Sequence, residues 1–285
     1  MTESRAASPH LRVLHLSDMH LFGDDTWHYG RVDTAAALRR VLDAAAGVAD
    51  IDLVALSCDL TDDGTPAAYR RLADLIEPWA AERGAAVAYA MGNHDDRAGF
   101  EEVLGARTGI VTVKGARVLH LDSSVPGAGY GLVDDAQLAW LRDELASSDT
   151  PAVVLLHHPP TPACTPLLQA LELQNPTALL DTCSGTGVLA ILAGHYHHSL
   201  VTAERGIPVI VAPGITNTTD LTAPAGHERA LTGSGFAVID IPLSAEEAPR
   251  VMVQRAPAPD DGQVIFDLDA ATVAEIATKA GPPRN

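Results

Sequence analysis

Short apolar runs that end in polar or glycine-containing residues recur along this chain. The runs are rich in Val, Ile and Leu, and loop-forming residues flank them. Runs of this length between loop residues are typical of buried β-strands. Strands are therefore predicted over residues 11–16, 52–57, 86–91, 117–122, 152–157, 188–194, 207–213, 236–241 and 251–255.

Apolar residues at helical spacing separate the early strands. Asp33 or Thr34 can cap a first helix, and Thr65–Pro66 is a start signal for a second, because proline suits the first helical position. Gly84 is suited to ending that second helix. The predicted helices reach from these starts to about Ala46 and to Gly84, and a third covers 135–147.

The order of these elements predicts the fold class and the domain organisation. Strands alternate with helices first and are joined more directly later, which favours an α/β (α+β) fold with a mixed sheet or two stacked sheets and helices outside. We expect a disordered segment at 1–10 and one domain at 11–255, with an inserted helix-and-loop element at about 161–187. Residues 256–285 are predicted to form a linker followed by a last strand and helix.

Composition and charge narrow the possible partners. Hydrophobic residues make up 47% of the 285 residues, which is enough for a large core and excludes a mainly disordered chain. The 19 Lys and Arg against 37 Asp and Glu give a formal charge of −18. A chain this acidic repels nucleic acids and anionic membranes, whereas bound metal ions can still attract a small anionic substrate.

The cysteine count and the apolar segments indicate the cellular compartment in which the protein is expected. Cys58, Cys164 and Cys183 form no CxxC pair, and an odd, sparse count favours free thiols in a reducing compartment. The sequence has no signal-peptide pattern and no run of eighteen apolar residues. We therefore expect a cytoplasmic protein.

Histidines and acids gather where the predicted strands end. Asp18 and His20 follow the first strand, and His195 and His197 follow the run at 188–194. A two-residue spacing on extended backbone directs both side chains of each pair to one face. Ligand sites form at the carboxyl ends of strands in α/β sheets, so these clusters can converge. The full candidate set is Asp18, His20, Asp59, Asn93, His157, His195 and His197.

The chemistry of this set points to metal ions. Imidazole, carboxylate and amide donors without a thiolate suit Mn, Fe, Zn or Co rather than a cysteine-based structural zinc. Seven ligands are too many for one catalytic ion that keeps an open position. They suit two ions per chain that share one carboxylate, the arrangement that serves in-line phosphoryl displacement.

In this order the residues resemble the signature of the calcineurin-like metallophosphoesterases. The matching motifs are Asp18-x-His20, Asp59, Gly92-Asn93-His94-Asp95, His157 and Gly194-His195-x-His197. The surrounding LSDMHLFG, GNHDD and LDSSVPG are similar to class III cyclic nucleotide phosphodiesterases and related bacterial glycerophosphodiesterases. The resemblance implies a four-layer αββα sandwich of two mixed sheets flanked by helices.

The resemblance also implies a role for each motif residue. Asp18, His20 and His197 would hold the first metal; Asn93, His157 and His195 would hold the second, and Asp59 would bridge the two. A bridging hydroxide would attack phosphorus. His94 would protonate the leaving oxygen, and Asp95 would orient His94. Cys58 departs from the glycine that the family has before its bridging aspartate, and we expect it to be tolerated as a small apolar residue.

Other polar residues have ordinary interpretations. The first histidine of the His157–His158 pair is favoured as the ligand, and Asp122–Ser123 suits either a turn or support of the site. Turn formation and helix capping account for the remaining loop acids. Ordinary packing or surface roles are expected for His15, His120, His198 and His227, and turn or capping roles for Asp62, Asp63 and Asp96. An ordinary role is favoured for His28 too, but His28 and Tyr29 are borderline, because the loop after Asp18-x-His20 lies near the substrate in similar enzymes.

The expected activity is metal-dependent hydrolysis of small phosphodiesters, with 3′,5′-cyclic nucleotides such as cAMP ahead of glycerophosphodiesters. A non-enzymatic scaffold on the same fold is the alternative, but it would have lost ligands or His94. A serine hydrolase is disfavoured because the chain has no GxSxG elbow. A homodimer is expected only as the commonest assembly of such chains.

Overall fold

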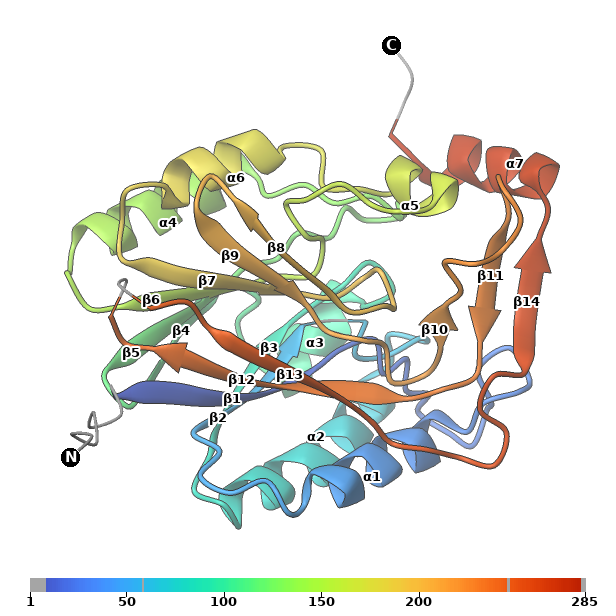
Figure 1. The fold of residues 1–285 in the computed structure, drawn as a ribbon, viewed down its shortest axis with the longest axis horizontal. Helices are drawn as coiled ribbons and strands as arrows, with labels where there is room; N and C mark the ends of the chain where they lie inside the picture. The colour runs from blue at the N-terminus through green and yellow to red at the C-terminus, as the bar shows by residue number, and fades with distance from the viewer. Residues whose placement is uncertain (1–8, 58, 245–246, 283–285) are drawn as a thin grey trace, which may run out of the picture.

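Two mixed β-sheets stack face to face in the computed structural model, which describes residues 9–57, 59–244 and 247–282 (Figure 1). The first sheet has the order β13-β12-β1-β2-β3, and the second has the order β4-β5-β6-β7-β9-β8. The first sheet contains β1 (His10–Leu16), β2 (Leu53–Ser57), β3 (Ala86–Ala90), β12 (Gly235–Pro242) and β13 (Arg250–Arg255). The second contains β4 (Gly109–Val113), β5 (Ala116–His120), β6 (Ala152–Leu155), β7 (Val188–Ala193), β8 (Leu200–Glu204) and β9 (Ile207–Val211).

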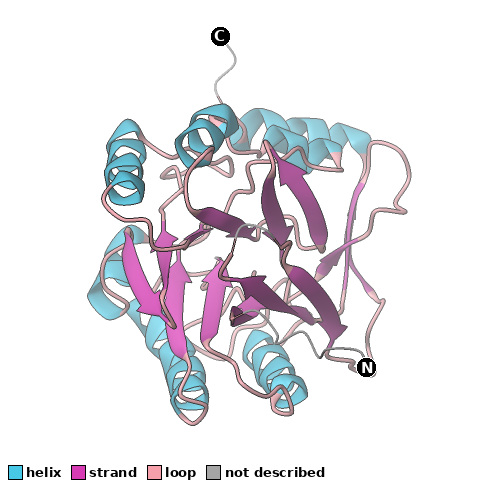
Figure 2. Cartoon of the chain, turned by 60° about the vertical axis from the view of Figure 1, so that its left-hand side comes forward, coloured by secondary structure: helices cyan, strands magenta, loops and turns pink. Residues whose placement is uncertain are grey.

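Helices cover the outer faces of both sheets, so that the layers are helix, sheet, sheet and helix (Figures 1 and 2). The first sheet is covered by α1 (Thr34–Ala45) and α2 (Pro66–Ala81), and the second by α4 (Asp135–Ala146) and α6 (Pro176–Cys183). This arrangement confirms the predicted four-layer αββα sandwich. The expected helices at 34–46 and 135–147 match α1 and α4 to within one residue.

Strict alternation in the central strands produces this layering. Leu14 and Leu16 of β1 pack toward α1 and α2, whereas Leu11 and Val13 pack against the second sheet. Side chains of a strand point alternately to its two faces, so a strand that is apolar on both faces belongs between two apolar layers. The near-continuous hydrophobic run at 11–16 is therefore the sequence counterpart of a strand in the middle of the sandwich.

Short side chains fix where the helices begin. The Asp33 carboxylate accepts a hydrogen bond from the Ala36 amide, and the Thr65 hydroxyl accepts one from the Ala68 amide. Each cap satisfies an amide that has no partner within the helix. The two predicted start signals are thus confirmed.

A third, smaller sheet stands beside the sandwich at one end (Figure 1). It has the order β10-β11-β14 and consists of β10 (Thr218–Thr219), β11 (Glu228–Leu231) and β14 (Val264–Leu268). The last helix of the described residues is α7 (Ala270–Ala280), which lies near α5 (Pro166–Ala170). The remaining helix is α3 (Arg97–Val103).

Three sequence expectations concern the termini, cysteines and membrane. Residues 1–8 and Cys58 lie outside the described residues. Cys164 is exposed and Cys183 is buried, and both are free thiols, as expected. Within the described ranges, no helix is long and apolar enough to cross a membrane.

Candidate metal centre

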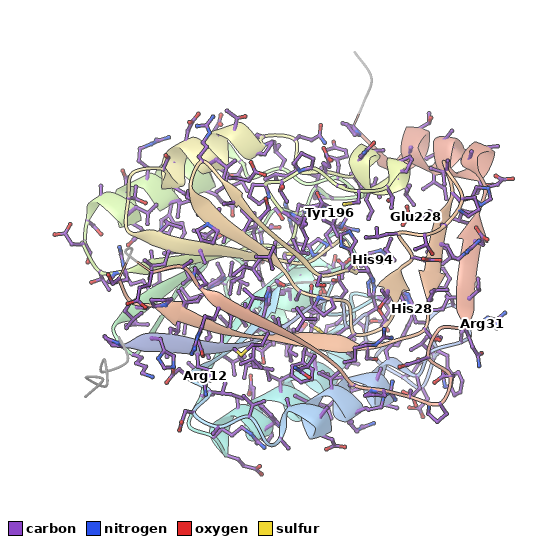
Figure 3. The ribbon with its side chains drawn as sticks, in the orientation of Figure 1. Arg12, His28, Arg31, His94, Tyr196 and Glu228 are labelled. Carbon is purple, nitrogen blue, oxygen red and sulfur yellow. The ribbon has the colours of Figure 1, made fainter. Side chains whose placement is uncertain are left out.

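The ends of five strands deliver the predicted ligands to one region. Asp18 and His20 follow β1, Asp59 follows β2, and Asn93 follows β3; His157 follows β6, and His195 and His197 follow β7. These strands are parallel neighbours within their sheets, so their carboxyl ends share one edge. Figure 3 shows His94 at this edge, with His28 and Glu228 arriving from other parts of the chain.

The backbone at this edge is unusual. Asp18, His20, Asp59, His195 and His197 all have positive φ, with values of 54°, 45°, 43°, 71° and 52°. Few non-glycine residues adopt such angles, and those that do cluster at functional sites. The expectation that the two paired motifs lie on extended backbone is therefore wrong. Left-handed turns after the strands, rather than strand alternation, direct these side chains inward.

One group of donor atoms comes from both sheets. Nε2 of His197 lies 3.5 Å from Oδ1 of Asp18 and 3.4 Å from Nε2 of His20. Nε2 of His20 lies 3.8 Å from Oδ2 of Asp59. One ligating atom from each of these four residues fits within 4.8 Å of the others, which is the spacing of atoms around a single ion.

A second group adjoins the first through Asp59. Nε2 of His157 lies 3.3 Å from Oδ2 of Asp59, 3.0 Å from Oδ1 of Asn93 and 3.1 Å from Nδ1 of His195. The same oxygen of Asp59 therefore faces both groups. This geometry is compatible with a dinuclear site in which Asp59 is shared.

The electrostatics of the site fit bound cations. Oδ2 of Asp18 is buried and has no hydrogen-bond partner among the described residues. Burial lowers the pKa of His20 to about 4 and lowers the pKa of His195 and His197 well below the usual value. These imidazoles are neutral at pH 7, which is the form that binds metals. The donor set thus suits a divalent metal centre.

Metal binding is expected to weaken as the pH falls through about 7. Burial raises the pKa of Asp18 to about 7 in the metal-free site, so below that pH a proton occupies the carboxylate that would bind the metal. One competing proton corresponds to a loss of affinity of up to about tenfold per pH unit. Calorimetric titration of the metal-free protein with Mn²⁺ at pH 6 and pH 8, in buffers with different ionisation enthalpies, measures both affinity and proton release. Equal affinity at the two pH values would contradict this electrostatic account.

Gly92 lets the segment after β3 approach Asp59 closely. A methyl group at Gly92 would collide with Oδ1 of Asp59 and would lie 2.5 Å from its amide nitrogen. Hydrogen bonds hold both the side chain and the backbone of Asp59: the His94 amide donates to Oδ1 of Asp59 at 2.9 Å, and the His20 amide donates to the Asp59 carbonyl at 2.8 Å.

Replacing Gly92 with alanine is therefore expected to displace Asp59. We expect the free energy of unfolding to fall by about 1–3 kcal/mol from overpacking, together with loss of bound metal. Thermal unfolding and metal analysis of purified protein measure the two effects. Gly47→Ala is the matched control, because nothing lies within 4 Å of the added methyl group. Normal metal content in Gly92→Ala would show that this close approach is unimportant.

Asp95 is placed differently from the expectation that it orients His94. Its carboxylate accepts hydrogen bonds from the amides of Leu60, Thr61 and Gly92, and from the Tyr69 hydroxyl at 2.9 Å. These contacts tie the loop after β2 to the loop after β3. Asp95 therefore supports the backbone around Asp59 rather than the His94 ring.

Asp62 occupies the position expected of Asp95. Its Oδ1 lies 3.1 Å from Nδ1 of His94, 3.0 Å from Nδ1 of His20 and 3.6 Å from Nδ1 of His28. The expectation that Asp62 is only a turn-forming acid is wrong. His28, the borderline case, lines the pocket, because a turn closed by the His28 amide and the Val32 carbonyl folds it against the His20 ring.

His94 is the most accessible of these imidazoles. Its side chain is 42% exposed, whereas the side chain of His20 is 3% exposed. Burial lowers its pKa, but the charge of Asp59 and the hydrogen bond to Asp62 outweigh burial and raise the pKa to about 9. The contact with Asp62 engages Nδ1 and leaves Nε2 available for a ligand.

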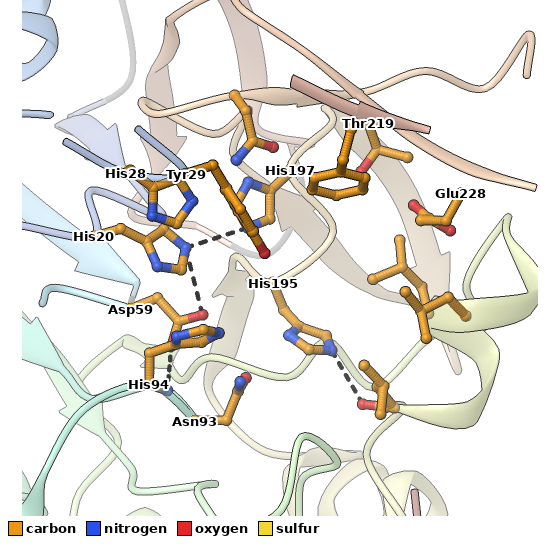
Figure 4. Close-up of a pocket in the computed structure, with 15 residues that line it drawn as sticks. His20, His28, Tyr29, Asp59, Asn93, His94, His195, His197, Thr219 and Glu228 are labelled. Atoms are coloured by element: carbon orange, nitrogen blue, oxygen red, sulfur yellow. Dashed lines mark hydrogen bonds and ion pairs between the residues drawn. The ribbon is translucent and has the colours of Figure 1, made fainter. Parts of the chain in front are cut away.

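A pocket opens above the candidate ligands (Figure 4). His20, Asp59, Asn93 and His94 lie at one end, and Glu228 lies at the other (Figure 4). The remaining lining residues come from the 28–29 loop, α5, the end of β7, the 217–219 segment and β14: His28, Tyr29, Leu167, Leu168, Leu171, His195, His197, Asn217, Thr219 and Phe266.

The other ordinary interpretations fit their observed contacts. The His158 ring packs on the His195 ring, and Nδ1 of His158 is hydrogen-bonded to Oγ of Ser123 at 2.9 Å. His158 therefore supports the candidate ligand His195, and Ser123 holds His158 in place. The Asp122 carboxylate accepts from the Ser124 amide, as a strand-end turn requires. Two acids have turn and capping roles: Asp63 accepts hydrogen bonds from the Gly23 and Thr65 amides, and Asp96 caps α3. Three histidines have local partners: His15 is hydrogen-bonded to Ser57 Oγ, His227 to Asp267, and His198 to the Ser199 carbonyl.

Comparisons with known proteins agree with this geometry. A family model described as Calcineurin-like phosphoesterase matches residues 11–199. A protein of Mycobacterium tuberculosis named cAMP/cGMP dual specificity phosphodiesterase is 40% identical over 79% of this chain and 74% of its own length. A probable cyclic nucleotide phosphodiesterase of Rhodococcus erythropolis is 42% identical over 78% of this chain and 76% of its own length.

More distant similarities point in the same direction. A glycerophosphodiester phosphodiesterase of Enterobacter lignolyticus is 28% identical over 70% of this chain and 76% of its own length. Among solved structures, a dimetal phosphatase from Danio rerio superposes with a TM-score of 0.58 at 14% identity, covering 85% of this chain and 98% of that chain. At that identity, the structural likeness shows a shared fold alone.

Proposed function

This chain belongs to the calcineurin-like phosphoesterase family, and we propose that it hydrolyses 3′,5′-cyclic nucleotides, with cAMP as the leading substrate. One observation carries the proposal: the seven candidate ligands follow five strand ends at one edge of the fold, and five of them line a single pocket: His20, Asp59, Asn93, His195 and His197. Relatives at 40% and 42% identity bear cyclic nucleotide phosphodiesterase names, which supports the choice of substrate class.

Two divalent ions per chain, from among Mn, Fe, Zn and Co, are proposed as the resident cofactors. Asp18, His20 and His197 would hold one ion, and Asn93, His157 and His195 would hold the other, with Asp59 shared. When bound, such ions supply positive charge that attracts a phosphodiester and lowers the pKa of water to give a nucleophile at neutral pH. Their presence also compensates the buried carboxylates of Asp18 and Asp59.

His94 is proposed to handle the proton of the leaving group. Its pKa of about 9 keeps the ring protonated at neutral pH, and its exposed position lets Nε2 reach a bound substrate. Asp62 holds Nδ1 at 3.1 Å and so fixes the direction of the other nitrogen. His94 can then donate a proton to the departing ribose oxygen as the P–O bond breaks.

Glycerophosphodiesters are the second candidate substrates, because a glycerophosphodiesterase is among the relatives at lower identity. A scaffold role is disfavoured, since the ligand set and His94 are all retained. The formal charge of −18 disfavours a nucleic acid polymer, whereas bound metal ions can still attract a small anionic substrate. A cytoplasmic location and a homodimer remain predictions from the sequence.

A side-by-side substrate panel tests the proposal. Protein reconstituted with manganese is expected to hydrolyse bis-p-nitrophenyl phosphate faster than p-nitrophenyl phosphate, and to convert 3′,5′-cAMP to AMP. Glycerophosphocholine measures the second candidate activity. Turnover of the aryl diester without any turnover of cyclic nucleotides would retain the phosphodiesterase and reject the proposed substrate class.

A further inference from the structure

The small β10-β11-β14 sheet forms a wall of the pocket. Ala230 of β11 lies directly opposite Thr219 of β10 on one side and Phe266 of β14 on the other. Glu228 is two residues from Ala230, so its side chain points to the same face as those of Thr219 and Phe266. All three of Thr219, Glu228 and Phe266 line the pocket, so this face of the small sheet forms its wall.

Glu228 is an unusual buried acid. The residue is 4% exposed, and its Oε2 has no hydrogen-bond partner within the described part of the chain. Burial raises its pKa, although the Thr165 hydroxyl partly stabilises the charged form. Buried carboxylates are ordinarily paired. In this molecule Asp240 is paired with Arg12 and Arg250, so the unpaired oxygen of Glu228 requires a different explanation.

The position of Glu228 supplies that explanation. It lies at the end of the pocket away from Asp59 and His94 (Figure 4). The lining of the pocket also includes apolar side chains, among them the leucines of α5 and Phe266. A ligand whose phosphate lies at the candidate metal end would therefore place a flat apolar group against these side chains and a hydrogen-bond donor at Glu228.

We propose that Glu228 selects the nucleobase by accepting a hydrogen bond from its exocyclic amine, while Phe266 and the α5 leucines contact the faces of the ring. This inference rests on the proposed hydrolysis of cyclic nucleotides and names the specificity residue of that same pocket. Adenine offers its 6-amino group as such a donor. Recognition of a base edge by hydrogen bonds, with aromatic and apolar contacts on its faces, is the usual mode in enclosed sites.

Glu228→Gln tests the acceptor role with almost no change in shape. The Thr165 hydroxyl is expected to hold the amide oxygen, because it already stabilises the charge of Glu228. The amide nitrogen would then face the pocket and present a donor where the wild type presents an acceptor. The preference for a base that carries an amine should be lost.

The substrates are 3′,5′-cAMP and the 3′,5′-cyclic monophosphate of purine riboside, which lacks only the 6-amino group. The wild type is expected to favour cAMP by about 10- to 100-fold in kcat/KM, the value of one hydrogen bond to a charged group. In Glu228→Gln the ratio should fall to within about threefold, with bound metal retained. Glu82→Gln, at an exposed acid beside α2, is the matched control and should keep the wild-type ratio.

The possible outcomes distinguish failure of the proposed Glu228 role from failure of the proposed cyclic nucleotide hydrolysis. A wild type that hydrolyses cAMP, together with a Glu228→Gln variant that keeps the full preference for it, overturns the role of Glu228 alone. So does a wild type without any preference between the two substrates. If Glu228→Gln instead loses a wild-type preference for cAMP over 2′-deoxy-cAMP, Glu228 contacts the ribose and not the base. A wild type that hydrolyses bis-p-nitrophenyl phosphate but neither cyclic nucleotide removes the proposed substrate class and this inference together.

Discussion

Replacing Asp59 with alanine is expected to abolish phosphodiester hydrolysis. Asp59 Oδ2 is the atom that faces both donor groups, 3.8 Å from His20 Nε2 and 3.3 Å from His157 Nε2. Its loss removes the shared ligand and one of the two carboxylate charges that balance the ions. We expect a loss of more than about 1,000-fold in kcat/KM, equivalent to about 4 kcal/mol of barrier, and fewer than two bound metals per chain.

The measurement combines metal analysis with turnover of bis-p-nitrophenyl phosphate by the same preparation. Asp143→Ala, at an exposed acid on α4, is the matched control and should leave both quantities unchanged. Circular dichroism establishes that the Asp59→Ala variant is folded. A folded variant with wild-type turnover would show that Asp59 is not a shared ligand.

Replacing His94 with alanine is expected to separate metal binding from proton transfer. His94 lies next to the proposed ligand Asn93 but is half-exposed, and its Nδ1 contacts Asp62 at 3.1 Å. The metal content should therefore stay at the wild-type value. Hydrolysis of cAMP, whose leaving ribose oxygen needs a proton, should fall by about 10²- to 10⁴-fold, the usual contribution of a positioned general acid.

The dependence on the leaving group identifies the role of His94. p-Nitrophenolate departs without a proton, so the rate for bis-p-nitrophenyl phosphate should fall far less than the rate for cAMP. His10→Ala, at a histidine that contacts Asp240 on the first sheet, provides the control. Equal losses for both substrates would indicate that His94 binds the phosphate rather than protonating the leaving oxygen.

The apolar runs predicted buried strands in a mixed sheet or two stacked sheets, and the resemblance to the calcineurin-like family added the four-layer sandwich. The runs at 11–16 and 152–157 correspond to β1 and β6, each packed between two apolar layers. Polar residues directly after such strands necessarily reach one edge of the fold. That is why the ligand candidates could be gathered from sequence alone.

The elements that the sequence did not predict have weaker patterns. The strands β4 and β8 alternate between partly exposed and exposed residues, and β10 has only two residues. The strand β11 is four residues long, and its first two residues, Glu228 and Arg229, are charged. Such segments become strands only through pairing with their neighbours, and local periodicity does not report that pairing.

Two features of the site were hidden for different reasons. Asp62 lies in the segment Thr61-Asp62-Asp63-Gly64, which has the composition of a turn, and only the tertiary fold brings three imidazoles to it. The positive φ angles at Asp18 and Asp59 have no sequence signal, because a positive φ is usually marked by glycine and these positions are aspartates. Such strain is maintained by the surrounding packing and hydrogen bonds.

The most direct test of the proposed activity is a titration of metal-free protein with Mn²⁺ while conversion of 3′,5′-cAMP to AMP is followed. The rate is expected to rise with added metal and to reach its plateau at two ions per chain. It should return to the background when the ions are removed with a chelator. Two tightly bound ions without cAMP turnover, or equal turnover in the metal-free protein, would contradict the assignment of a dinuclear cyclic nucleotide phosphodiesterase.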